Sequence, residues 1–151
     1  MESAQKLICK TRAVDCSLSA MWQRWTTHEG LLTFFGRDNK IELRPNGAFE
    51  IYFLTGNPYG LRGSERCKVL SFIPEEMFSF TWNAPPRFPE ARASDAFTWV
   101  VVEFARIRGG RTEVTLRHLG WPDDARWEPV FGYFDEAWDS VLDSLEESVR
   151  A

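Results

Sequence analysis

Cysteine and histidine are both scarce in this 151-residue chain, and their spacing excludes the common metal sites. The three cysteines, Cys9, Cys16 and Cys67, form no pair at the short spacing that zinc sites use, and the two histidines, His28 and His118, lie far apart. An odd number of cysteines favours reduced thiols, buried or half-buried, in a cytoplasmic protein. We therefore expect no metal ion, no other cofactor and a cytoplasmic location.

Runs of basic residues and long apolar segments are absent as well. There are 18 Lys and Arg against 22 Asp and Glu, the formal charge is -4, and the arginines are dispersed. Because phosphate binding needs a concentrated basic face, we do not expect nucleic acid as a partner. Residues 1–12 lack the apolar core of a signal peptide, and no run reaches the roughly 18 apolar residues of a membrane helix, so we expect neither secretion nor a membrane span.

Aromatic residues are abundant by contrast. Twelve Phe, seven Trp and three Tyr make up 15% of the chain. Large rings bury much surface each, so a set of this size needs either a thick core or a cavity that the rings line. Both interpretations remain open for any single ring. The length predicts one domain, residues 1–151, with a substantial core.

The C-terminal stretch 127–150 has the pattern of a single long amphipathic helix. Its apolar residues recur at spacings of three and four, whereas its acidic residues fall largely elsewhere. The apolar stripe consists of Val130, Phe131, Phe134, Trp138, Val141, Leu142, Leu145 and Val149. A helix with three rings on its stripe needs a wide concave surface to lie in, and a curved sheet would provide one.

The rest of the chain mostly alternates with period two, which is typical of strands. We predict strands at 6–14, 40–44, 48–54, 65–73, 77–82, 97–107 and 112–119. Ser17 is a candidate N-cap for a helix from Leu18 to about Thr26, and a second helical turn follows at 31–35. These elements predict the α+β class, with a curved antiparallel sheet of about seven strands wrapped around the last helix.

The last two strands form a hairpin around residues 108–111, and the apolar pattern predicts its register. A three-residue loop pairs Phe104 with Leu116 and Val102 with His118, whereas a two-residue loop mixes apolar with charged positions. The inward-facing residues are then Val100, Val102, Phe104, Val114, Leu116 and His118. Trp99 is left with Val101 on the outer face, as edge packing or as a self-association patch in a homodimer.

Residues 83–95 interrupt this pattern with two adjacent prolines and a third at Pro89. A connection of about a dozen residues is longer than most, and such loops are often functional or mobile. We predict either a mobile hairpin end or a flap over the mouth of a pocket.

Short motifs that span almost the whole chain resemble a known superfamily. They lie at 22–27, 29–31, 34–35, 45–49, Gly63, 69–70, 74–82 and 112–120, followed by the closing helix with Trp138. In this order they resemble the SRPBCC or START-like superfamily, and within it the group named after the activator of Hsp90 ATPase. The resemblance implies a helix-grip fold with a cavity between the sheet and the C-terminal helix. In related proteins such cavities hold lipids, polyketides or other apolar molecules, and in a few the cavity became an active site.

Two titratable residues could carry chemistry in such a cavity. The register directs His118 into the apolar face, where it would act as a general acid or base or be a hydrogen-bonded core histidine. Glu65 shares the parity of an inward-facing strand residue, so it is either an exposed strand residue or, if it is buried, needs a partner such as Arg66, Arg117 or His118 or carries a raised pKa. No phosphate loop or nucleophile elbow is present.

Three functions follow from these residues and from the resemblance. The candidate cavity residues are Phe49, Glu65, Phe80, Trp82, Phe104, His118, Phe131, Phe134 and Trp138. Binding of an apolar or amphipathic small molecule ranks first. The second is a cyclase- or aromatase-like enzyme that uses His118 and Glu65. The third, an interaction protein of the Hsp90 co-chaperone type that contacts a chaperone, rests on the name of the resembling group alone.

Overall fold

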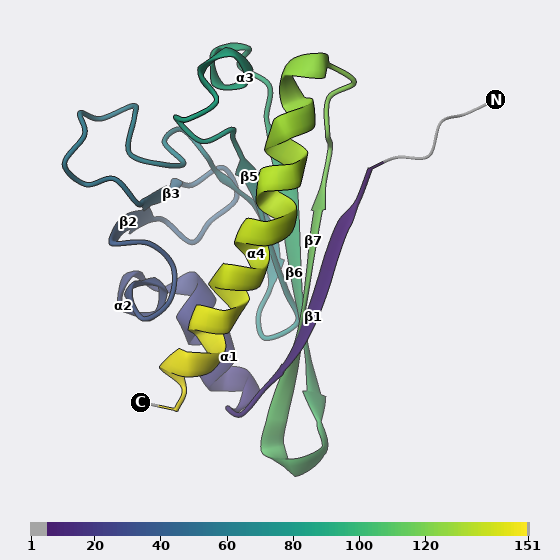
Figure 1. Ribbon diagram of the computed structural model, residues 1–151. Coiled ribbons are helices and arrows are strands. Elements are labelled where there is room, and N and C mark those ends of the chain that lie inside the picture. The colour runs from purple at the N-terminus through teal and green to yellow at the C-terminus, as the bar shows by residue number, and fades with distance from the viewer. Residues whose placement is uncertain (1–5, 151) are drawn as a thin grey trace.

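The structure, a computed structural model, describes residues 6–150 (Figure 1). The strands are β1 (Ile8–Val14), β2 (Asp38–Ile41), β3 (Phe49–Tyr52), β4 (Val69–Ile73), β5 (Met77–Trp82), β6 (Thr98–Ile107) and β7 (Arg111–Leu119). The helices are α1 (Leu18–Thr26), α2 (His28–Leu32), α3 (Pro89–Ala93) and α4 (Glu128–Ser148), with 3-10 turns at Arg108–Gly110 and Ala125–Trp127. The predicted α+β class is confirmed, as are two short helices after the first strand and a long helix at the end.

The seven strands divide into two groups. Five form an antiparallel sheet in the order β1-β7-β6-β5-β4, while β2 pairs only with β3. Isolated bridges, Ala48 to Lys68 and Tyr52 to Gly63, connect the two groups. The prediction of a single strand over 65–73 is wrong because Arg66 takes a left-handed φ of 71°, which ends the extended conformation, so that β4 begins only at Val69.

Helix α4 lies across the concave side of the five-stranded sheet (Figure 1). Its fully buried residues recur at the predicted spacing: Val130, Phe134, Trp138, Leu142 and Leu145. Phe131, Val141 and Val149, which complete the predicted stripe, are half-buried at its margins.

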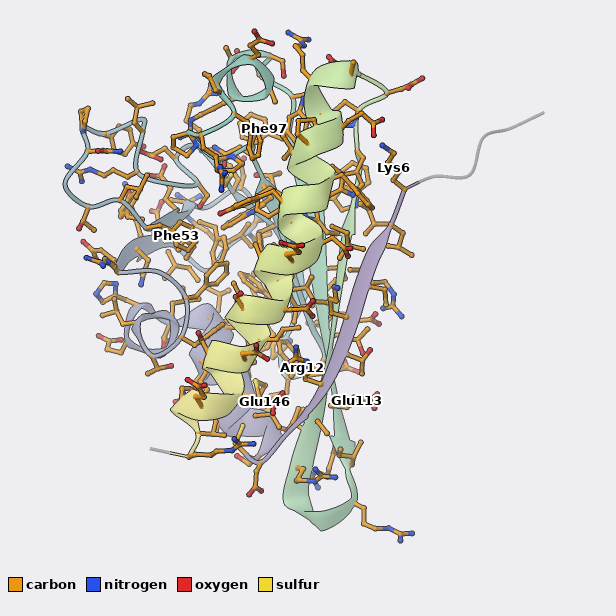
Figure 2. All side chains as sticks on the ribbon, viewed as in Figure 1. Lys6, Arg12, Phe53, Phe97, Glu113 and Glu146 are labelled. Carbon is orange, nitrogen blue, oxygen red and sulfur yellow. The ribbon has the colours of Figure 1, made fainter. Side chains whose placement is uncertain are left out.

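Ionic contacts hold α4 against the edge strand β1. Lys10 lies 3.1 Å from Asp139, and Arg12 lies 2.6 Å from Asp143 and 2.9 Å from Glu146. Figure 2 shows Arg12 of β1 beside Glu146 of α4. Hydrogen bonds to Asp143 and Glu146 raise the pKa of Arg12. Acidic residues on one side of α4 are therefore matched by basic residues of a single strand.

Both short helices begin at side-chain caps. The Ser17 hydroxyl accepts from the Ala20 N–H at 3.1 Å, as predicted, and the Thr27 hydroxyl accepts from the Gly30 N–H at 3.0 Å. Because Thr27 acts as a cap, α2 starts at His28 instead of the predicted residue 31.

The β6–β7 hairpin has the predicted three-residue loop, and every predicted inward-facing residue is buried. The individual pairs differ: Phe104 faces Val114, and Val100 faces His118, two residues away from the predicted register. Gly109 and Gly110 have φ of 81° and 70°, which lets the turn start directly after Ile107. A shift of two residues keeps each side chain on its face, so the faces were correct although the pairs were not.

Two further expectations concern the thiols and the membrane. The three cysteines are free, and Cys9 is exposed, contrary to expectation, because the odd positions of β1 face away from α4. Within residues 6–150, no helix combines the length and apolarity that crossing a membrane requires. Part of the signal-peptide prediction concerns residues 1–5, which lie outside the described residues.

Candidate functional site

A cavity of about 710 Å³ lies between α4 and the end of the sheet near Trp82. Helix α4 contributes one wall, and the rest of the lining comes from Trp82 at the end of β5, from Phe35 and from residues in the segments 53–54, 62–64 and 83–87. The lining residues of α4 are Tyr133, Phe134, Glu136, Ala137, Trp138, Ser140 and Val141. Phe53, which also lines the cavity, is labelled in Figure 2 on the β2–β3 side of α4.

Aromatic rings form the deep part of the cavity. The ring centroids of Trp82, Trp138 and Phe35 lie 5.6 to 5.8 Å from one another, and Phe134 stacks on Trp138 at 6.0 Å. Phe134 and Trp138 are one helical turn apart, so they share a face of α4, while Trp82 is an inward position at the end of β5. The chain thus builds an apolar floor from α4, from the end of β5 and from Phe35 in the turn that follows α2.

His118 lies behind this floor and is fully buried. The Trp138 indole N–H donates to its Nδ1 at 3.0 Å, so the ring proton is on Nε2, which donates to the Thr98 hydroxyl at 2.6 Å. That hydroxyl donates in turn to the Trp82 carbonyl at 3.1 Å. Burial lowers the pKa of His118 to about 3. His118 is therefore a neutral core histidine that orients Trp138, and it is not among the residues that line the cavity.

Glu65 is buried in a turn instead of a strand. Its carboxylate accepts from the backbone N–H groups of Gly60, Arg62 (2.9 Å) and Gly63 (2.8 Å), and it lies 3.1 Å from Arg92. Burial alone would raise the pKa of Glu65, but these backbone donors outweigh it, and the pKa is lowered. Its partner is Arg92, and not one of the three residues considered from the sequence.

The two side chains that the enzyme hypothesis requires together are therefore apart. Among the described residues, Glu65 and His118 share no hydrogen-bond partner, and neither lines the cavity. Glu65 organises the 57–65 loop, and His118 supports the cavity floor.

The rings that the sequence nominated fall into two groups. Trp82, Phe134 and Trp138 line the cavity. The others lie elsewhere: Phe49 packs on Phe80 at 4.2 Å and Phe104 on Trp22 at 5.9 Å in the core, whereas the half-buried Phe131 packs on Trp121 at 5.0 Å at its margin. Alternation identifies the face of the sheet on which a ring lies, but not its depth beneath α4.

Most of the remaining wall comes from loops, which sequence periodicity does not reveal. Phe53, Leu54 and the 62–64 segment line one side, and Pro85, Pro86 and Arg87 line another. The two prolines and Arg87 belong to the 83–95 segment, and its proline content and length were the signals in the sequence that it could border a pocket.

The 83–95 segment is held in place by Arg92. It contains α3, and the Arg92 guanidinium donates to the carbonyls of Gly60, Gly63 and Ala84, each at 2.7 Å. This short helix was not predicted, because five residues are too few for a periodic pattern. The contacts join the segment to the 57–65 loop across the cavity rim.

Metal ligands do not gather anywhere in the part of the chain that the structure describes. No three His, Cys, Asp or Glu side chains of residues 6–150 lie close enough together to hold an ion. The cavity is instead an apolar space with polar groups at its rim.

Comparison with known proteins gives one family and many related folds. The family described as Activator of Hsp90 ATPase homolog 1-like protein matches residues 15–150. Among curated proteins, none matches this sequence. A solved structure from Nitrosomonas europaea has 20% identity and a TM-score of 0.75 over 99% of this chain and 97% of its own.

Two other solved structures are similar. A protein from Mesorhizobium loti has 17% identity and a TM-score of 0.76, over 96% of this chain and 97% of its own. The Aha1 dimer from Colwellia psychrerythraea has 16% identity and a TM-score of 0.69, over 95% of each chain. At these identities the similarity concerns the fold, and it confirms the predicted helix-grip arrangement.

Proposed function

The chain belongs to the family of Activator of Hsp90 ATPase homolog 1-like proteins, and on that basis we propose that it binds an apolar or amphipathic small molecule between α4 and the sheet. The observation that carries this proposal is the cavity of about 710 Å³ with its aromatic floor. Ligand sites of roughly 300–1,000 Å³ commonly bury drug-sized molecules. Rings such as Trp82 and Trp138 contribute binding energy because a ligand removes large apolar surfaces from water.

Two serines of α4 allow a matched test of this proposal. Ser140 lines the cavity and is exposed, whereas Ser144, one turn further along the same helix, is exposed outside it. Ser140→Trp places an indole in the cavity mouth, and Ser144→Trp makes the same change on the outer surface. We expect the neutral fluorophore 1-aminoanthracene to bind the wild type and Ser144→Trp alike, and Ser140→Trp at least tenfold more weakly. Equal binding by both variants would place the site elsewhere, and no binding by any of the three would remove the support for the proposal.

The enzyme alternative has no supporting observation at this cavity. The rim carries Arg62, Arg87 and Glu136, but the proposed acid and base, His118 and Glu65, are engaged in other contacts. Binding therefore remains the function that the geometry favours.

Self-association is a separate proposal, and it rests on the outer face of the sheet. Trp99 is 42% exposed on that face, and a relative of the same fold is described as a dimer. We expect Trp99→Lys to shift a wild-type dimer to monomer in size-exclusion chromatography with light scattering. Leu32→Lys, a change at an equally exposed residue of α2, should leave the dimer intact. A wild type that is monomeric at every concentration contradicts this proposal. Co-elution of the protein with Hsp90 in the same chromatography tests the chaperone contact.

A further inference from the structure

The rim of the cavity carries more positive than negative charge. Two guanidinium groups, those of Arg62 and Arg87, line it together with one carboxylate, that of Glu136. The chain as a whole is acidic, with a formal charge of -4, so this local excess of positive charge is opposite to the average. Charges of one sign around an apolar space select ligands whose polar end has the opposite sign.

Arg62 is held in place by its backbone N–H, its Nε and the Tyr52 ring. Its backbone N–H donates to Glu65 at 2.9 Å, its Nε donates to the Asn57 carbonyl at 2.7 Å, and its guanidinium carbon lies 6.0 Å from the centre of the Tyr52 ring. Among residues 6–150, no acidic side chain forms an ion pair with it. The aliphatic part of the side chain and Nε are therefore fixed, and the two terminal guanidinium nitrogens of Arg62 remain available to a ligand.

Arg87 is positioned by rings and not by carboxylates. Its guanidinium carbon lies 5.2 Å from the Tyr133 ring centre and 5.4 Å from the Phe88 ring centre. Within the described part of the chain it has neither a hydrogen bond nor an ion pair. By contrast, Arg12 and Arg92 both contact carboxylates. An arginine over an aromatic face keeps its charge and its planar fork free for an anion.

A buried donor on the cavity wall also lacks an acceptor. The indole N–H of Trp82 is one of two buried side-chain groups of the described residues without a hydrogen-bond partner, and Trp82 lines the cavity. The other, on Trp25, belongs to a residue that does not line it. Buried donors are nearly always paired, so this N–H is unusual, but it is buried within the protein and is not a contact for a head group at the rim, where the charged contacts come from Arg62 and Arg87.

From the two guanidinium groups at the rim and the aromatic floor beneath them, we infer that the ligand is an amphipathic carboxylate. Its apolar body lies against Trp138 and Phe134, and its carboxylate pairs with Arg62 and Arg87, whose forks match the two oxygens. This inference rests on the proposed function, because it specifies the ligand of the same cavity.

Three ligands of equal chain length test the charge of the head group. Decanoate, decan-1-ol and decylamine, which is protonated at pH 7, are used to displace 1-aminoanthracene from the wild type. We expect decanoate to displace it at a concentration at least tenfold below decan-1-ol, and decylammonium to be weakest. Equal displacement by acid and alcohol, or stronger displacement by the amine, overturns the inference and leaves the proposed function standing. If the fluorophore itself does not bind, the proposed function fails first, and the inference fails with it.

Substitutions at the rim locate the head group. Arg87→Gln removes an exposed charge that makes no hydrogen bond or ion pair within residues 6–150, so we expect the fold to be retained, decanoate affinity to fall about tenfold and decan-1-ol affinity to be unchanged. Glu136→Gln should strengthen decanoate binding. Arg108→Gln, on the exposed β6–β7 turn, is the control and should change neither ligand. A loss of acid and alcohol affinity in equal measure by Arg87→Gln would show that Arg87 shapes the cavity without binding the carboxylate, and would overturn the inference.

Discussion

At the scale of the residue, His118 couples the sheet to the cavity floor. Its two ring nitrogens join Trp138 of α4 to Thr98 of β6, and the Thr98 hydroxyl continues to the Trp82 carbonyl. Trp82 and Trp138 are the two tryptophans that line the cavity. The His118 imidazole thus orients the Trp138 ring and, through the Thr98 hydroxyl, is linked to the backbone of Trp82.

The pH dependence of stability tests this role of His118. Burial lowers its pKa to about 3 in the folded state, whereas the value in an unfolded chain is about 6.5. Between these values only the unfolded chain takes up the proton, so the stability contributed above pH 6.5 is lost as pH falls. From pH 7 to pH 5 this residue should cost about 2 kcal/mol.

Urea denaturation of His118→Gln at the two pH values measures that loss. We expect the variant to be less stable than the wild type at pH 7, by an amount that shrinks by about 2 kcal/mol at pH 5. Thr98→Val, which removes the acceptor and keeps the imidazole, should be destabilised by about 1–3 kcal/mol with the wild-type pH slope. A His118→Gln slope equal to that of the wild type would mean that the imidazole protonates in the folded protein.

Alanine substitutions at two glycines with similar φ angles distinguish the cost of displacing the Trp99 ring from the cost of backbone strain. Gly120 and Gly109 have φ of 78° and 81°, but a Cβ on Gly120 would lie 2.2 Å from the Trp99 ring, whereas one on Gly109 would meet nothing within 4 Å. We expect Gly109→Ala to cost about 1–2 kcal/mol from backbone strain. Gly120→Ala should cost about 1–3 kcal/mol more, from the displaced ring. Equal losses in urea denaturation would show that the Trp99 ring does not lie over Gly120.

At the scale of the element, the acidic side of α4 depends on β1. Arg12 contacts Asp143 and Glu146, and its side chain is 23% exposed, so water screens these contacts only in part. We expect Arg12→Met to lower the free energy of unfolding by about 1–2 kcal/mol, because the carboxylates then repel one another. In 1 M NaCl the loss should be smaller. Arg44→Met, which breaks the exposed pair with Glu42, should change stability by less than about 0.5 kcal/mol in either salt.

The 57–65 loop depends in a similar way on one buried carboxylate. Glu65 is 2% exposed and collects three backbone donors and Arg92. We expect Glu65→Gln to cost about 2–4 kcal/mol, because Arg92 loses its counter-charge. Trypsin should then cleave faster after Arg62. Glu42→Gln, at an exposed carboxylate outside the loop, is the control. An unchanged cleavage rate in Glu65→Gln would contradict the role of Glu65 as the anchor of the loop.

Features of an element that depend on residue spacing or residue type could be predicted from the sequence. The α4 stripe and the inward faces of β6 and β7 follow from residue spacing alone, and the Ser17 cap follows from residue type. The late start of β4 at Val69 does not, because residues 65 and 66 lie in a turn where Glu65 is held by backbone donors of a loop and by Arg92, 27 residues away. The predicted register of the β6–β7 hairpin was wrong by two residues, because a slip of two residues leaves every side chain on the same face and the apolar pattern does not detect it.

At the scale of the whole molecule, the cavity arises where segments without regular spacing meet α4. Trp82, Phe134 and Trp138 could be nominated because they sit at inward positions of regular elements. Arg62 and Arg87 could not, because the paths of their loops are set by tertiary contacts. Three of the four floor rings were therefore within reach of sequence analysis, whereas Phe35 and the charged rim, which we infer selects the ligand, were not.

Native mass spectrometry of freshly purified protein, followed by denaturation of the same sample, tests most directly whether this cavity holds a ligand. Wild type and Ala137→Trp are compared, since Ala137 is a half-buried lining residue of α4 and an indole there would fill the cavity. We predict an additional mass on the wild type that leaves on denaturation and is missing from the folded variant. The same mass on both proteins would contradict binding in this cavity, as would a wild type that carries no additional mass and takes up neither decanoate nor decan-1-ol on incubation.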